Sequence, residues 1–83
     1  MRKIVLPVQI EPLEEGGFLA SSESIQGCHA EGETVAEALE NLEDVARILL
    51  EILREDGVPF PLGLEEFTPG AVFKAQVVVP LPE

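Results

Sequence analysis

Apolar and polar residues alternate near the N-terminus, which is the pattern of a β-strand with one buried face. Between residues 3 and 11, every second residue from Ile4 to Ile10 is aliphatic and falls on one side of an extended backbone. Pro7 lacks an amide N–H, so one edge of this strand is expected to be unpaired or bulged there. The alternation predicts a first strand over residues 3–11.

Glycine-containing turns divide the following residues into two further short strands. Gly16 and Gly17 allow the positive φ of a tight hairpin, and residues 18–23 then resume an extended pattern. A second turn over residues 24–27 leads into a third short run, residues 28–31. Three antiparallel strands are therefore expected in the first third of the chain.

The middle of the chain has the pattern of one amphipathic helix. Thr34 and Glu37 form a capping box, in which the Thr hydroxyl accepts the third helical N–H and the Glu carboxylate reaches back to the cap. Gly57 and Pro59 end the element, so a helix is predicted over residues 35–56. The apolar face comprises Val35, Leu39, Leu42, Ala46, Leu49 and Leu53, and the charged arc opposite comprises Glu37, Glu40, Glu43, Asp44, Arg47, Glu51 and Glu55.

The last third of the chain predicts a loop and then a fourth strand. Residues 58–70 are rich in proline and glycine and are expected to be irregular. Residues 72–79 include three consecutive valines, which suits a strand covered on both faces. This strand can pair with the first only in parallel, by a right-handed crossover through the helix. The fold class is therefore α+β, with the order β-β-β-α-β and one long helix packed on one face of a mixed four-stranded sheet.

One helix covers only one face of such a sheet, so the opposite face needs another partner. Val5, Leu19, Val72 and Val78 are expected to point toward that face. Monomers rarely expose large apolar patches, so we expect a homo-oligomer, either a dimer or a tetramer.

Chain length and composition predict one soluble domain. The chain has 83 residues, of which 46% are apolar and 25% charged, the proportions of a single folded domain over residues 1–83. No run approaches the ~18 apolar residues of a membrane helix, and the N-terminus becomes acidic too early for a secretory signal. The protein is therefore expected to be cytoplasmic and to have no membrane partner.

The charge balance is strongly acidic, with 16 Asp and Glu against 5 Lys and Arg and a formal net charge of −11. A charge of this sign repels phosphate backbones, so direct nucleic-acid binding is not expected. It also attracts a basic protein partner, although a purely solubilising surface explains it equally well. The candidate partner-binding residues are Glu14 and Glu15 at the hairpin tip and Glu37, Glu40, Glu43 and Asp44 on the helix.

The side chains that most often carry out catalysis are few. Cys28 is the only cysteine and His29 the only histidine, which excludes an internal disulfide and a cysteine-rich metal site. Neighbours on a strand point to opposite faces, so His29 is badly placed to activate Cys28. No phosphate-binding glycine pattern opens the helix. We expect no catalytic, cofactor-binding or metal-ligating residues, and no enzymatic activity.

An ordered set of short motifs runs over residues 14–61. It joins a glycine-glycine-aromatic hairpin, a glycine-cysteine turn, a helix start of the form G-x-T-x-x-E-A-L and a closing D-G-x-x-x-P. The residues that form these motifs are Gly17, Phe18, Ala20, Gly27, Cys28, Gly32, Thr34, Glu37, Ala38, Leu39, Gly57 and Pro61. The ordered set resembles the pattern of the HicB-like antitoxin family. Gln26 replaces the usual proline of that pattern and Phe18 the usual tyrosine, and neither change removes a core position.

The resemblance implies a partial ribonuclease H-like fold with the strand order 3-2-1-4. In ribonuclease H enzymes, acids on the first strand, the helix and the fourth strand converge on metal ions, whereas residues 72–79 contain no acid. Family members commonly neutralise a small, basic, RNA-cleaving HicA-type toxin by covering its active site. The resemblance therefore implies an antitoxin-like interaction protein that binds such a toxin.

One feature leaves an alternative open. Many family members add a DNA-binding domain, and we expect none here because the last predicted strand ends at residue 79. The alternative function is an orphan oligomeric domain that binds a small ligand or an unrelated protein, or retains some hydrolytic activity, and has no toxin partner. A short basic protein encoded beside this chain would distinguish the two.

Overall fold

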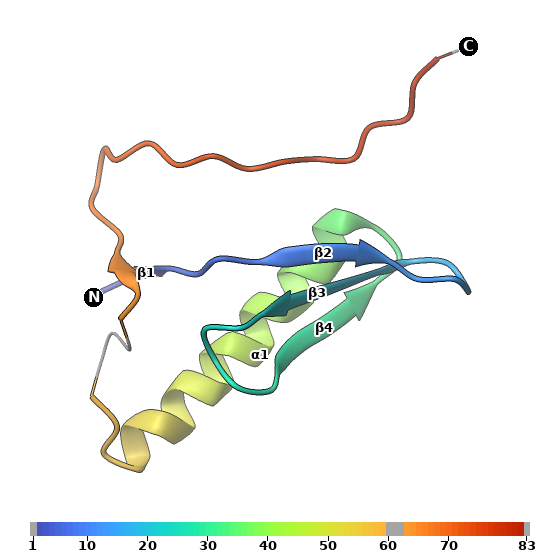
Figure 1. Ribbon diagram of the computed structural model, residues 1–83. Helices are drawn as coiled ribbons and strands as arrows, with labels where there is room; N and C mark the ends of the chain where they lie inside the picture. The colour runs from blue at the N-terminus through green and yellow to red at the C-terminus, as the bar shows by residue number, and fades with distance from the viewer. Residues whose placement is uncertain (1, 60–62, 83) are drawn as a thin grey trace.

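The computed structural model describes residues 2–59 and 63–82, and in these residues it contains one long helix and five strands. Three strands form an antiparallel sheet on the helix, and two short strands pair beside it (Figure 1). The α+β class is confirmed. Pro61 of the family pattern lies outside the described residues. The elements are β1 (Ile4–Val5), β2 (Gln9–Pro12), β3 (Phe18–Ser22), β4 (Cys28–Gly32), α1 (Val35–Glu55) and β5 (Glu65–Glu66).

The larger sheet is an antiparallel meander of β2, β3 and β4 in chain order. At the first turn the Gly16 amide donates to the Leu13 carbonyl, and the Leu13 amide donates to the Gly17 carbonyl, both at 3.0 Å. Gly16 and Gly17 have φ values of 102° and 85°, which a residue with a Cβ adopts only under strain. The predicted hairpin is confirmed.

The helix begins with the predicted capping box. The Glu37 amide donates to the Thr34 hydroxyl at 3.0 Å, and the Glu33 amide donates to the Glu37 carboxylate at 3.1 Å. Asp56 caps the C-terminus, so the helix ends one residue before the predicted limit. Among the described residues, no helix is both long and apolar enough to cross a membrane.

The backbones of the helix and the sheet are in close contact at Gly32, the last residue of β4. A Cβ on Gly32 would lie 2.3 Å from the Ala38 amide nitrogen, far inside normal contact distance. Small and aliphatic side chains from both layers fill the core beside this contact. The buried core consists of Ala20, Ile25, Cys28, Ala38, Leu42 and Ala46.

The predicted strand over residues 3–11 is interrupted at Pro7, with β1 before this residue and β2 after it. Pro7 has no N–H to donate, so a continuous ladder through this position loses a hydrogen bond. β1 pairs instead with β5, a short antiparallel strand inside the segment that was expected to be irregular, with Ile4 opposite Glu66.

The prediction of a fourth strand over residues 72–79 in a four-stranded sheet of order 3-2-1-4 is wrong. Residues 71–82, which we call the arm, lie outside every strand and are exposed throughout. The described sheets have three strands and two strands. A β-rich sequence becomes a strand only when a neighbour supplies its hydrogen bonds, and valine content does not say which neighbour that is.

The sheet face away from α1 is also more polar than expected. Gln9, Glu11, His29 and Glu31 are exposed there, and Leu19 lies half-buried among them. Val72 and Val78, which were expected on this face, belong instead to the arm, so the face does not present the predicted set of apolar residues.

Replacement of Gly32 tests the close approach of α1 to β4. Gly32→Ala should lower the free energy of unfolding by roughly 1–3 kcal/mol, because the added Cβ forces backbone apart. Gly57→Ala is a control, since Gly57 has a positive φ of 78° but open space around it. It should cost only about 1 kcal/mol of conformational strain. Urea unfolding followed by circular dichroism measures both, and equal losses would contradict a special role for the contact.

The buried thiol predicts a pH dependence of stability. Cys28 is only 2% exposed, and its burial raises the pKa of the thiol. The unfolded chain therefore loses this proton first, at about pH 8.5. The contribution of Cys28 to the free energy of unfolding should be constant below that pH. It should decrease as the pH rises above it. In urea titrations across the same pH range, Cys28→Ala should not show this decrease in the free energy of unfolding. Parallel pH curves for the two proteins would contradict the prediction.

Candidate functional site

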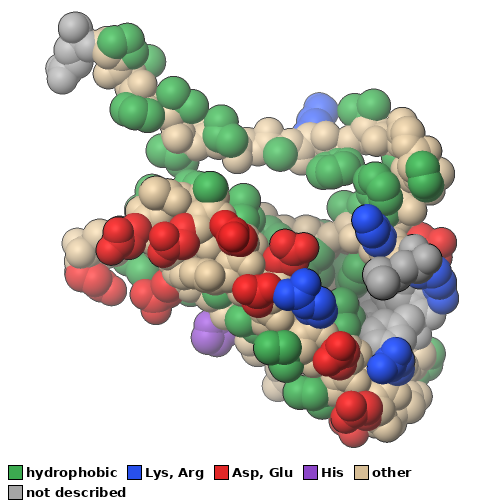
Figure 2. All heavy atoms as spheres, turned by 180° about the vertical axis from the view of Figure 1, so that it is seen from behind, with side chains coloured by type: hydrophobic (Ala, Val, Ile, Leu, Met, Phe, Trp, Pro, Cys, Tyr) green, Lys and Arg blue, Asp and Glu red, His purple; other side chains and the backbone are tan. Residues whose placement is uncertain are grey.

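Exposed carboxylates gather over the outer face of α1 and the adjoining end of the sheet (Figure 2). They include every residue predicted to bind a partner. The helix contributes one group and the hairpin tip between β2 and β3 the other, and all of them are exposed: Glu37, Glu40, Glu43 and Asp44, and Glu14 and Glu15. The structure thus places the predicted acids on the surface, where an approaching protein meets them.

A shallow hollow of about 500 Å³ lies between the hairpin tip and the start of α1. Its lining includes four glutamates, Glu15, Glu31, Glu33 and Glu37, which we call the acidic corner. Two of the predicted residues, Glu15 and Glu37, are therefore brought together from distant parts of the sequence. The other four predicted acids lie outside this lining.

Glu31 and Glu33 were missed because their position depends on strand register. Glu31 lies on β4 opposite Leu19, and Glu33 follows directly before the helix cap. Alternation along one strand does not reveal which residue of another strand it faces. The signal available in the sequence was the pair of acids on either side of Gly32, immediately before the capping box.

Backbone contacts fix the shape of the acidic corner. A Cβ on Gly17 would lie 2.9 Å from the Gly32 carbonyl oxygen, so the hairpin tip and the end of β4 are in direct contact. The hydrogen bond from the Glu33 amide orients the Glu37 carboxylate. The corner is therefore held by two glycine approaches and one cap rather than by long side chains that pack together.

The chemistry of the acidic corner suits basic side chains. Carboxylates accept charge-assisted hydrogen bonds from Lys and Arg, and these are stronger than bonds between neutral groups. Asp44, farther along α1, already pairs with Arg47 one turn away, so part of its charge is balanced within the helix. No group of three or more His, Cys, Asp or Glu side chains positioned for a metal ion occurs in residues 2–59 and 63–82.

Cys28 and His29 are placed as the alternation predicts. The Cys28 side chain is buried in the core under α1, and His29 is exposed. The two side chains therefore lie on opposite faces of the sheet, and the imidazole does not approach the thiol.

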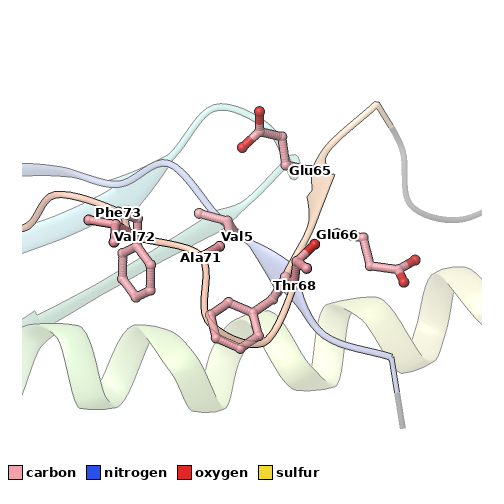
Figure 3. Close-up of a pocket in the computed structure, with 8 residues that line it drawn as sticks. Val5, Glu65, Glu66, Thr68, Ala71, Val72 and Phe73 are labelled. Carbon is pink, nitrogen blue, oxygen red and sulfur yellow. The ribbon is translucent and has the colours of Figure 1, made fainter.

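A second hollow, of about 370 Å³, lies where the arm leaves the β1–β5 pair (Figure 3). Glu65 and Glu66 line it, but both carboxylates point away from its centre. Glu66 accepts instead from the Arg2 guanidinium at 2.9 Å. A small-molecule site needs polar groups that converge on the ligand, and this hollow does not present them.

Comparison with curated proteins identifies relatives of this chain. Antitoxin HicB 1 of Photorhabdus laumondii is 39% identical over 75 residues, which cover 90% of this chain and 44% of that protein. A UPF0150 protein of Synechocystis is 40% identical over 66% of this chain and 75% of the relative. A second Synechocystis UPF0150 protein is 32% identical over 65% of this chain and 68% of the relative. No protein-family model and no solved structure matches the chain.

The lengths of these relatives differ. The chain spans less than half of the Photorhabdus antitoxin, but two thirds or more of each Synechocystis protein. The alignment with the antitoxin covers 90% of this chain and so includes the hairpin, the capping box and the helix that form the acidic corner. On this similarity, the chain belongs to the HicB-like antitoxin family, together with the UPF0150 proteins of Synechocystis.

Proposed function

We propose that this chain is an antitoxin that binds a small, basic, RNA-cleaving toxin of the HicA type and blocks it by covering its active site. The observation that carries the proposal is the acidic corner on a member of the HicB-like family. A ribonuclease that holds anionic RNA presents a basic surface, and four glutamates around one hollow are complementary to it.

Electrostatic attraction explains the first stage of binding. A net charge of −11 creates a field that speeds the approach of a basic protein. This attraction is screened over ~8 Å at physiological salt, so acids near the contact matter more than distant ones. The acidic corner therefore sets the orientation of the encounter.

Apolar surface beside the acids supplies the lasting contact. Leu39 is 38% exposed on α1, immediately before Glu40. Burial of apolar surface depends little on salt, and it slows dissociation rather than speeding association. The two contributions can therefore be separated by their salt dependence.

Blocking by coverage requires no chemistry from the antitoxin. A protein bound over the active site excludes the RNA substrate whether or not it contributes catalytic groups. The proposal accordingly assigns no catalytic residue, no cofactor and no direct nucleic-acid binding to this chain.

Affinity purification of the tagged full chain from its native cells tests the proposal first. A small basic protein should be recovered in a fixed ratio and identified by mass spectrometry. Its RNA-cleaving activity should fall as the purified chain is added. Recovery of no such protein, or of one whose activity is unaffected, would overturn the proposed function.

Charge reversal tests the acidic corner with the recovered toxin. Glu15→Lys with Glu31→Lys should slow association by about tenfold at low salt and flatten its salt dependence. Glu51→Lys with Glu55→Lys is the matched control, because it changes the net charge equally at the far end of α1. Stopped-flow binding across a salt series measures both. Equal slowing by the two pairs would show that only the total charge acts.

A further inference from the structure

The arm is the most exposed apolar part of the described chain. Val72 is 95% exposed, Val77 78% and Leu81 87%. Figures 1 and 2 both show the arm as a single length of chain that leaves the body of the domain at one end. Soluble proteins rarely leave such a run of apolar side chains uncovered, so the arm needs a partner.

The arm has two different sides when it is extended. Phe73, Ala75, Val77 and Val79 alternate with residues that include Lys74 and Gln76. Successive side chains of a strand point to opposite faces, so one side of the arm is apolar and the centre of the other is polar. This pattern fits the edge of a sheet that has one core face and one solvent face.

The β2 strand offers such an edge. β2 is the outer strand of its sheet and is hydrogen-bonded only to β3 among the described residues. The Leu13–Gly17 hydrogen bond sets the alternation, so Glu11 and Gln9 turn their backbone groups toward β3. Ile10 then turns its N–H and C=O to the open edge, and Pro12, which has no N–H, turns its C=O there.

The two faces of that edge match the two sides of the arm. On the core face, Leu6, Ile10 and Leu50 are half-buried against the core. Asn41 donates to the Glu31 carbonyl on β4, so the opposite flank of α1, which carries Leu50, faces the β2 side. A strand docked on β2 would cover these residues with its apolar side.

Charge favours the same arrangement. Residues 67–82 contain no Asp or Glu, although the chain has 16, and they include Lys74. On the solvent face of β2, Glu11 is exposed. The polar side of a docked arm would place Lys74 on the same face as this carboxylate, and opposite charges on neighbouring strands attract. The arm can therefore approach an acidic domain without repulsion.

The root of the arm is fixed against the β1–β5 pair, and from there the arm runs back past β2 of its own domain without pairing with it (Figure 1). The Phe67 amide donates to the Lys3 carbonyl at 2.6 Å, and the Phe67 and Phe73 rings meet edge to face at 6.0 Å. A turn between them, closed by the Ala71 amide on the Thr68 carbonyl at 3.0 Å, sets the direction of exit. The arm thus presents its length to another molecule.

We propose that the arm docks as a strand on the open β2 edge of a second copy of this chain, and that two copies exchange arms reciprocally. Each copy carries one arm and one open edge, so a two-fold dimer satisfies both and leaves no further site open. This proposal concerns self-association and does not depend on the proposed toxin partner.

The mass of the full chain in solution tests the exchange. Sedimentation equilibrium should give a dimer. Val77→Asp, on the apolar side of the arm, should weaken the dimer by about tenfold or more, because the variant replaces a valine that the dimer would bury with a charged side chain. Gln76→Asp adds the same group on the polar side and should weaken it much less. The proposal would be overturned if the chain remained a monomer at the highest protein concentration measured. Equal effects of the two substitutions would also overturn it.

Cross-linking distinguishes exchange from docking within one chain. In a Cys28→Ala background, a chain with Glu11→Cys is mixed with a chain with Lys74→Cys and treated with a short flexible bis-maleimide. A covalent dimer containing one of each chain supports the proposal. Ala75→Cys, on the other side of the arm, is the matched control and should link poorly. If a chain carrying both Glu11→Cys and Lys74→Cys gives only an internal link, the arm docks on its own domain and the exchange is excluded.

Discussion

The contact between Gly32 and the Ala38 amide fixes the rest of the domain. Because Gly32 has no Cβ, the end of β4 and the first turn of α1 approach more closely than any other residue would allow. Only Glu33 and Thr34 separate the strand from the helix, and the cap forms there: the Thr34 hydroxyl accepts from the Glu37 amide, and the Glu37 carboxylate accepts from the Glu33 amide. On its other side, the end of β4 lies against the hairpin tip through Gly17. The core and the acidic corner thus meet at the same end of β4.

The predictions from sequence succeeded where the determining interactions are local. The hairpin at Gly16 and Gly17 depends on backbone conformations that glycine tolerates, and the helix start depends on a cap within four residues. Both are encoded in neighbouring residues. The pairing of β1 with β5 was not predicted, because it joins residues at least 60 positions apart and β5 has no strand pattern of its own. The valines of the arm predicted a strand that is not formed, because a strand needs a neighbour and no local feature identifies that neighbour.

The acidic corner shows the same division. Glu37 was predicted from its place on the exposed helix arc and Glu15 from the hairpin tip, and both line the hollow. Glu31 and Glu33 join them only because β4 lies in a particular register beside β3 and ends against α1. Charge along the chain therefore indicated that acids are exposed, but it did not indicate which of them lie together. The remaining predicted acids on α1 are exposed but do not line the hollow.

The exposed arm has a consequence for the survival of the chain. Proteases bind their substrates as single extended segments, and residues 71–82 already have this form, while β3 and β4 are tied into a sheet. The core lies entirely in residues 20–46 and does not include the arm. A cut in the arm would therefore leave a folded remainder with an open β2 edge, whereas a covered arm would be shielded. The rate at which proteases cleave the arm therefore depends on whether a partner covers it. The fraction of chains with an intact arm then reports the fraction that is assembled.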